Sequence, residues 1–236
     1  MTFNDLVELY EAKKIQFGKS TYKQISKLLA EAKSKHKQFF LSSKAAQKTI
    51  EAGKQPDHEQ SWRAFKGKNL EKLIEYIIQD EVKGLGLIIV NGNSLERTVS
   101  SNLSAELSQV KRNLLVDFGE FGGQLPDVDM VIYEPKTCRI VAVLSSKVTL
   151  RERIAQTGYW KMKLLSDKVT KHIKVFFITP DEDGTLTIRK PAKKGRAIVE
   201  MDTDGCYVLN ENDIQESDKV KTFDKFIDDL KLLIKI

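Results

Sequence analysis

The most informative stretch of the chain is residues 126–153, PDVDMVIYEPKTCRIVAVLSSKVTLRER. Two strand-like segments within it, 127–133 and 139–145, are joined by the turn-type linker Glu134-Pro135-Lys136-Thr137. Apolar and β-branched residues dominate both segments, so the pattern predicts a β-hairpin.

Ser145-Ser146-Lys147 ends the second strand of this hairpin. Side chains alternate between the two faces of a strand, so Ser145 and Lys147 are expected to point the same way, with Asp127 beside them. A carboxylate next to a lysine at a sheet edge suits metal-assisted hydrolysis of a phosphodiester. The carboxylate would hold Mg²⁺, which prefers oxygen ligands and lowers the pKa of a bound water. The lysine would orient or deprotonate that water, or neutralise charge on the phosphate oxygens.

Pro126-Asp127 also has a plain structural interpretation. Pro-Asp is a common turn dipeptide, and it recurs at Pro56-Asp57 and Pro180-Asp181. The lysine at the end of an apolar strand, and the helix start that follows it, favour the catalytic interpretation.

That helix start is Thr149-Leu150-Arg151-Glu152-Arg153. Thr149 and Glu152 match a capping box, which accounts for the glutamate. The two arginines are unexplained by it, because their positive charges stand at the positive end of the helix dipole. Arginine donates to guanine O6 and N7, and a carboxylate accepts from cytosine N4. Arg151, Glu152 and Arg153 are therefore expected to read G·C pairs in the major groove, and contacts with phosphates are the alternative.

Taken together, these motifs resemble the type II restriction endonucleases of the PD-(D/E)xK superfamily. Within it they resemble the branch whose sites contain CCGG or CC-N-GG, in which Ser replaces the acid of the xK motif and an R-(D/E)-R motif follows the lysine. Residues 145–160 are similar to the BsaWI type, which joins a helical N-terminal domain to such a core. The resemblance implies an α/β fold, a restriction-endonuclease-like core of a mixed sheet flanked by helices.

The activity that this resemblance implies is Mg²⁺-dependent cleavage of double-stranded DNA at a short palindrome containing GG/CC, by a homodimer or a higher oligomer. Two alternatives stay open. One is a PD-(D/E)xK nuclease without strict sequence choice, acting in repair or recombination. The other is a nuclease-fold DNA-binding module that has lost catalysis.

The resemblance also implies the residues of the site. Catalytic roles fall to Asp127, Lys147, Glu71 and Ser145, the metal ligands are Asp127, Glu71 and the backbone carbonyl of Ser146, and DNA is bound by Arg151, Glu152 and Arg153.

One position departs from the family pattern. Members with Ser in the xK motif often carry a compensating Glu two helical turns past the arginines, where this chain has Trp160 and Lys161. Related folds take a Glu from the helix before the core sheet, which points to Glu71. Glu75, one turn later on the same face, and Asp129 are the alternatives. The two glutamates could equally be solvated helix carboxylates.

The rest of the chain suggests two parts. Apolar residues recur at helical spacing over 2–51 and again from about Trp62 to Val82, so we expect a basic helical segment over 1–58 and a catalytic and DNA-recognition domain over 59–236. Strands are expected near 85–90, at 174–179, and two or three more up to Leu209, before a final amphipathic helix. The basic run Arg189–Arg196 either grips phosphates or is an ordinary surface loop.

Charge is concentrated at the start of the chain, which carries a formal net charge of +6 over 236 residues. Residues 1–56 hold 11 lysines and 5 acidic residues, whereas the remaining 180 hold 28 basic and 28 acidic ones. A polyanion such as DNA is the natural partner, and a solvated lysine-rich helical face is the alternative. Only two cysteines, no signal-like N-terminus and no long apolar run favour a cytoplasmic protein without a membrane partner. A P-loop and GxGxxG are missing, so no nucleotide cofactor is expected.

Overall fold

The computed structural model describes residues 1–148 and 151–234, and over 151–153 it describes the backbone without the side chains. The N-terminal third is helical. It contains α1 (Phe3–Phe17), the 3₁₀ segment η1 (Gly18–Gln24), α2 (Ile25–Leu41), α3 (Lys44–Glu51) and α4 (His58–Gly84). Side-chain oxygens of Thr2, Ser43 and Asp57 accept from backbone amides at the starts of α1, α3 and α4, which explains where these helices begin.

A mixed sheet forms the centre of the described part of the chain, with strand order β1-β4-β5-β6-β7-β8. The strands are β1 (Ile88–Asn91), β4 (Met130–Glu134), β5 (Arg139–Ser146), β6 (Lys174–Thr179), β7 (Gly205–Val208) and β8 (Val220–Thr222). β1, β4 and β5 pair antiparallel, and β5 to β8 pair parallel. A separate small ladder joins β2 (Val116–Asp117) to β3 (Gly123–Gln124).

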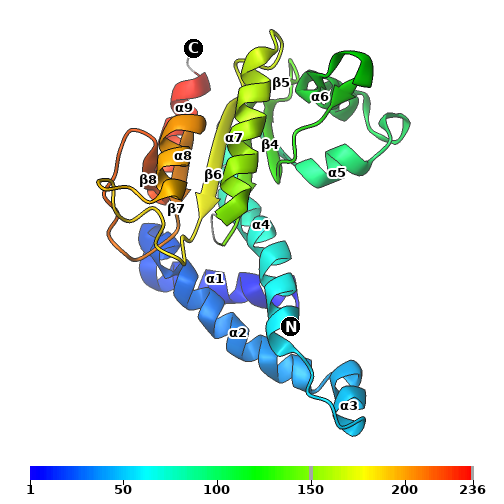
Figure 1. The fold of residues 1–236 in the computed structure, drawn as a ribbon, viewed down its shortest axis with the longest axis vertical. Helices are drawn as coiled ribbons and strands as arrows, with labels where there is room; N and C mark the ends of the chain where they lie inside the picture. Colours follow the sequence, from blue (N-terminus) through cyan, green and yellow to red (C-terminus); the bar gives the residue numbers. More distant parts are fainter. Residues whose placement is uncertain (149–150, 235–236) are drawn as a thin grey trace.

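Helices cover both faces of this sheet, as Figure 1 shows. Ile132, Leu144 and Ile178 pack with α1, α2, α4 and α9 (Phe226–Ile234) in one core cluster. Their neighbours along the strands face the other way. They pack with α5 (Gly92–Arg97), α6 (Ala105–Leu114), α7 (Arg151–Ser166) and α8 (Lys194–Asp202) in two further clusters. Short 3₁₀ turns, η2 (Ser100–Asn102), η3 (Gly119–Phe121) and η4 (Phe223–Lys225), complete the fold. The α/β layering expected from the sequence, a mixed sheet flanked by helices, is confirmed.

The predicted hairpin is present as β4 and β5, and the strand at 174–179 as β6. The expectation of several strands between β6 and Leu209 was wrong in part. Residues 194–202 form α8, and only β7 is a strand in that interval among the described residues. The basic run Arg189–Arg196 therefore ends inside a helix, and Arg196 has no exposed surface.

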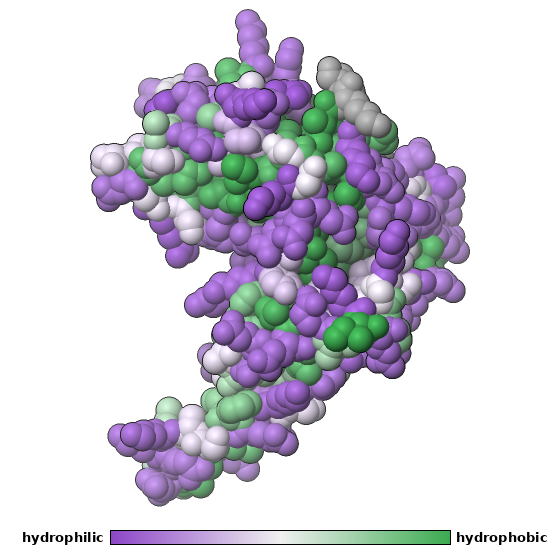
Figure 2. All heavy atoms as spheres, turned by 180° about the vertical axis from the view of Figure 1, so that it is seen from behind, coloured by the Kyte–Doolittle hydropathy of each residue, from purple (hydrophilic) through white to green (hydrophobic). Residues whose placement is uncertain are grey.

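An arm formed by the end of α2, by α3 and by the start of α4 projects from the body (Figure 1). Viewed from behind, the surface is hollowed where this arm leaves the body (Figure 2). Leu6 of α1 and Leu28 of α2 nevertheless share a core cluster with the sheet residue Ile132. The division of the chain into two parts at residues 58 and 59 stays a prediction. It falls at the first residue of α4, the helix that runs from the arm to the sheet.

Candidate active site

Three charged side chains meet at the carboxyl end of β5. Nζ of Lys147, the residue after this strand, lies 2.6 Å from Oε1 of Glu71 on α4 and 3.8 Å from Oδ1 of Asp129. Leu70 and Ile74 of α4 are fully buried against the sheet. Glu71 stands between them at the border of that apolar stripe, which brings its carboxylate to the strand end.

Asp129 is built into the hairpin, with only 1% of its surface exposed. Its backbone N–H donates to the carbonyl of Leu144 over 2.9 Å. Its Oδ2 accepts from the backbone N–H of Ser146 over 2.6 Å and from the Ser146 hydroxyl over 3.4 Å. Burial and these hydrogen bonds hold the carboxylate in one place beside Lys147.

Two carboxylates share the ammonium of Lys147, and this sets the electrostatics of the site. Burial raises the pKa of Glu71, the hydrogen bond from Lys147 opposes that rise, and the nearby Asp129 charge adds to it. Burial also raises the pKa of Glu75, one turn further along α4. Two carboxylates thus compete for one ammonium, and burial holds the pKa of Glu71 above its ordinary value.

The donor set fits a hard divalent cation. Glu71 and Asp129 could supply carboxylate oxygens, and the Ser146 carbonyl is the backbone donor that the family resemblance implies. Among the described residues, no group of three or more His, Cys, Asp or Glu side chains could hold a metal. Mg²⁺ commonly uses one or two carboxylates and keeps several waters, so a two-carboxylate site suits it.

The contacts described for Asp127 and Ser145, two of the residues proposed from the sequence, are with neighbouring elements. Asp127 is half-buried, and its Oδ2 accepts a hydrogen bond from Nε2 of Gln156 on α7 over 2.8 Å. Ser145 is buried and pairs in register with Phe177, on the sheet face that α7 and α8 cover. The structure thus gathers Glu71, Asp129 and Lys147 with Ser146, while it ties Asp127 to the following helix.

α7 begins at Arg151, four residues after Lys147. Thr149, the N-cap expected from the sequence, and the side chains of Arg151, Glu152 and Arg153 lie outside the described residues. The helix start nevertheless follows directly from the strand end that carries the charged cluster.

The family's compensating-glutamate position has a structural use here. Lys161 is buried, its Nζ lies 2.5 Å from Oδ2 of Asp204, and it donates to the carbonyl of Ile173 over 3.3 Å. This buried ion pair fastens α7 to the segment before β7. The burial of Lys161 could have been predicted from the sequence, because Lys161 lies at helical spacing from the buried Ile154 and Leu164.

Comparison with known proteins shows the family of this chain. The family model described as BsaWI restriction endonuclease type 2 matches residues 106–229, more than half of the chain. The chain belongs to this family. Asp129, Lys147 and α7 fall within the matched region, whereas Glu71 precedes it.

Two relatives agree with a type II restriction enzyme. The chain is 38% identical over 176 residues to MjaVIP of Methanocaldococcus jannaschii, covering 72% of this chain and 76% of that protein. It is 39% identical over 127 residues to HpyAORF263P of Helicobacter pylori, covering 54% of this chain and 64% of that protein. The names of both relatives describe them as type II restriction enzymes.

The solved complex of restriction endonuclease PspGI with substrate DNA matches with a TM-score of 0.53 at 14% identity, covering 98% of this chain and 93% of that one. At 14% identity this match shows only that the two proteins share a fold. Family and relatives together make the chain a type II site-specific deoxyribonuclease. No described helix combines the length and apolar character needed to cross a bilayer.

Proposed function

We propose that this enzyme hydrolyses phosphodiester bonds of double-stranded DNA at a short palindrome containing GG/CC, similar to CCGG, with Mg²⁺ as cofactor. The observation that carries the proposal is the cluster of Glu71, Asp129 and Lys147 at the end of β5. It stands directly before the helix start that carries Arg151 and Arg153.

Glu71, Asp129 and the Ser146 carbonyl would hold Mg²⁺, and a bound Mg²⁺ would supply polarisation of the scissile phosphate and a lower pKa of the attacking water. Glu71 fixes the Lys147 ammonium, so the lysine is positioned to orient that water or to offset charge on the phosphate oxygens. Asp127, the ligand proposed from the sequence, remains a candidate that substitution has to test.

Arg151, Glu152 and Arg153 are the proposed base-reading residues. Two arginines and one carboxylate suit two guanines and a neighbouring cytosine, which is why GG/CC is the proposed core of the target. The basic segment 1–58 would add phosphate contacts without sequence choice.

A homodimer is the proposed functional form. A palindrome has a two-fold axis, and one active site per strand requires two subunits related by that axis. α7 exposes Tyr159, Met162 and Leu165 at 46%, 66% and 51% on its outer side. Because α7 also begins with the proposed reading residues, the axis would pass close to both copies of α7, and this apolar face would join them.

Plasmid cleavage with and without Mg²⁺, followed by sequencing of the cut ends, tests the proposal. Discrete fragments ending at a GG/CC palindrome support it. A smear points to a nuclease without sequence choice, and a gel shift without cutting points to a binding module. Either of these last two results overturns it.

A further inference from the structure

The connection between β6 and α8, residues 180–193, leaves the sheet at the carboxyl end of β6, beside the carboxyl end of β5 that carries the charged cluster. β5 and β6 run parallel, with Ser146 opposite Ile178, so both strands end side by side. Glu182 reinforces this proximity. Its backbone N–H donates to the carbonyl of Val148 over 3.4 Å, and its carboxylate lies 2.9 Å from Nζ of Lys66 on α4.

Buried polar groups fix the first part of this connection. The carboxylate of Asp181, 2% exposed, accepts from the backbone N–H groups of Thr185 and Leu186, each over 2.9 Å. Lys193 donates to the carbonyls of Asp183 and Gly184 over 3.3 and 3.0 Å. These contacts close a compact turn after β6.

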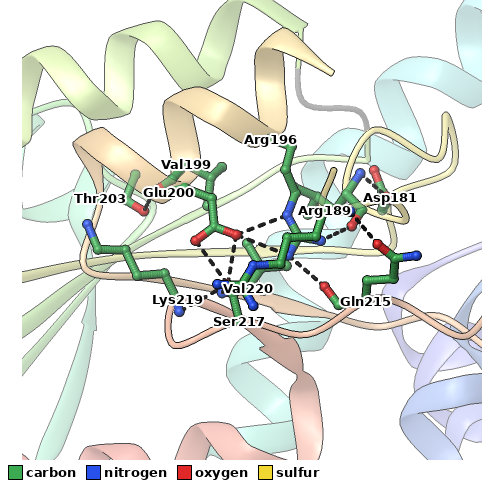
Figure 3. A network of polar contacts seen from close by, with 11 residues as sticks. Asp181, Arg189, Arg196, Val199, Glu200, Thr203, Gln215, Ser217, Lys219 and Val220 are labelled. Carbon is green, nitrogen blue, oxygen red and sulfur yellow. Dashed lines mark hydrogen bonds and ion pairs between the residues drawn. The ribbon is translucent and has the colours of Figure 1, made fainter. Parts of the chain in front are cut away.

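Arg196 fixes the second part, and Figure 3 shows how its guanidinium gathers three segments. It donates to the carbonyl of Leu186 and, over 2.6 Å, to that of Gln215, and it lies 3.0 Å from Oε1 of Glu200. Gln215 in turn accepts from the backbone N–H of Arg189 over 2.9 Å. A fully buried charge is costly unless it is paired, so a completely satisfied arginine indicates a loop with a defined shape.

These hydrogen bonds fix the backbone of the loop, and basic side chains project from it into solvent. Arg189, Lys190 and Lys194 are exposed, whereas Lys193 is engaged with the turn. Lys194 borders a surface cavity of about 520 Å³ whose lining also includes Ala155, in the first turns of α7. The basic loop and the proposed reading helix are therefore neighbours.

We propose that Arg189, Lys190 and Lys194 form a second DNA-contact surface, which binds backbone phosphates beside the bases read by the start of α7. This rests on the proposed function, since it assumes that α7 faces the duplex. An ordinary surface loop would have no need of a buried arginine and a buried aspartate to hold its shape, whereas a phosphate-binding loop gains from losing little entropy on binding.

The test is the triple variant Arg189→Ala, Lys190→Ala, Lys194→Ala, compared with the control Lys136→Ala, Lys168→Ala, Lys171→Ala. The control removes three exposed lysines from the turn before β5 and from the segment between α7 and β6. These lysines lie at the amino ends of β5 and β6, whereas the basic loop follows the carboxyl end of β6. Binding to target and random duplexes is measured in EDTA, so that no cleavage occurs, over a series of salt concentrations.

We expect the plot of log affinity against log salt to flatten by about 0.9 for each lost phosphate contact in the triple variant, equally for both duplexes. The control should keep the wild-type slope. An unchanged slope, a change shared by the control, or a loss confined to the target duplex overturns the proposal. Because this measurement needs no cleavage, it stands apart from failure of the proposed function, which wild-type digestion of plasmid reveals.

Discussion

Gln156 of α7 donates a hydrogen bond to Oδ2 of Asp127 over 2.8 Å. It joins the helix that begins with the proposed reading residues to the segment just before β4. Asp129, two residues further on, lies 3.8 Å from Nζ of Lys147. On these two contacts we expect Asp127 to position α7 and Asp129 to act beside Lys147 in the cleavage step.

Asp127→Asn separates these roles, because the amide oxygen of Asn can still accept from Gln156 but is a poor metal ligand. If Asp127 positions α7, we expect the variant to cleave within about tenfold of wild type, while Asp129→Asn loses cleavage by about 10²–10⁴-fold. Single-turnover cleavage in saturating Mg²⁺ measures both. An inactive Asp127→Asn enzyme that still binds target DNA would return the metal-ligand role to Asp127.

Glu71→Gln is expected to impair cleavage far more than Glu75→Gln, although both residues are half-buried on α4. The reason is that only Glu71 contacts Lys147 among the contacts described for the two. Lys147→Ala should reduce cleavage by about 10²–10⁴-fold and leave DNA binding in EDTA near wild type. Equal losses in the two glutamine variants would mean that α4 is merely structural at this point.

The comparison of Asp127 with Asp129 marks a limit of sequence reasoning. Period-two alternation places both residues on one face, so the pattern alone cannot choose between them. The regular strand begins only at Met130, and the alternation does not govern the residues before it. Glu71 could be predicted from the sequence through the family resemblance. The apolar stripe on α4 determines where that helix meets the sheet, and Glu71 borders this stripe.

Arg196 marks a second limit. Its carbonyl partners belong to Leu186 and Gln215, which are 10 and 19 residues away along the chain. No local pattern reports such contacts, and a run of five basic residues in eight looks like solvent-exposed surface. The hairpin and β6 were predictable because their signals are local.

Asp181 predicts a pH dependence of stability. Burial, with a further contribution from Asp183, raises its pKa from 3.8 to about 6 against the hydrogen bonds from Leu186 and Thr185. The folded state therefore binds this proton more tightly than the unfolded state. Its contribution is most favourable below pH 4 and declines as pH rises to 6, by about 3 kcal/mol at 1.36 kcal/mol per unit.

Urea unfolding of wild type and Asp181→Asn at pH 4 and pH 7 measures this effect. The difference in unfolding free energy between the two proteins should shift by about 2 kcal/mol between these pH values, in favour of wild type at the lower one, because at pH 4 the unfolded carboxyl is already partly ionised. A pH-independent difference would show that Asp181 is ionised throughout.

The outer face of α7 predicts the oligomeric state. Met162→Glu with Leu165→Glu places two carboxylates on the exposed apolar face. If the proposed dimer forms through this face, the variant should sediment as a monomer at concentrations where wild type sediments as a dimer. As a control, Leu232→Glu alters an exposed residue of α9 and should leave the dimer intact. A double variant that stays dimeric would move the subunit contact to another surface.

The base-reading residues give the most selective prediction. Arg151→Ala or Arg153→Ala should each reduce discrimination between target and random DNA by about 1–3 kcal/mol, the value of one bidentate arginine–guanine pair, which is about one to two powers of ten in affinity ratio. Nonspecific affinity should barely change, because it comes from phosphate contacts made by other cations. Arg139→Ala is the matched control and should leave both affinities unchanged. Arg139 is exposed at the amino end of β5, the end opposite to the charged cluster. Competition binding with a target duplex and a scrambled duplex, at one fixed salt concentration, measures the ratio directly. If Arg151→Ala weakens both duplexes by the same factor, the arginines bind phosphates, and the choice of GG/CC must come from other residues.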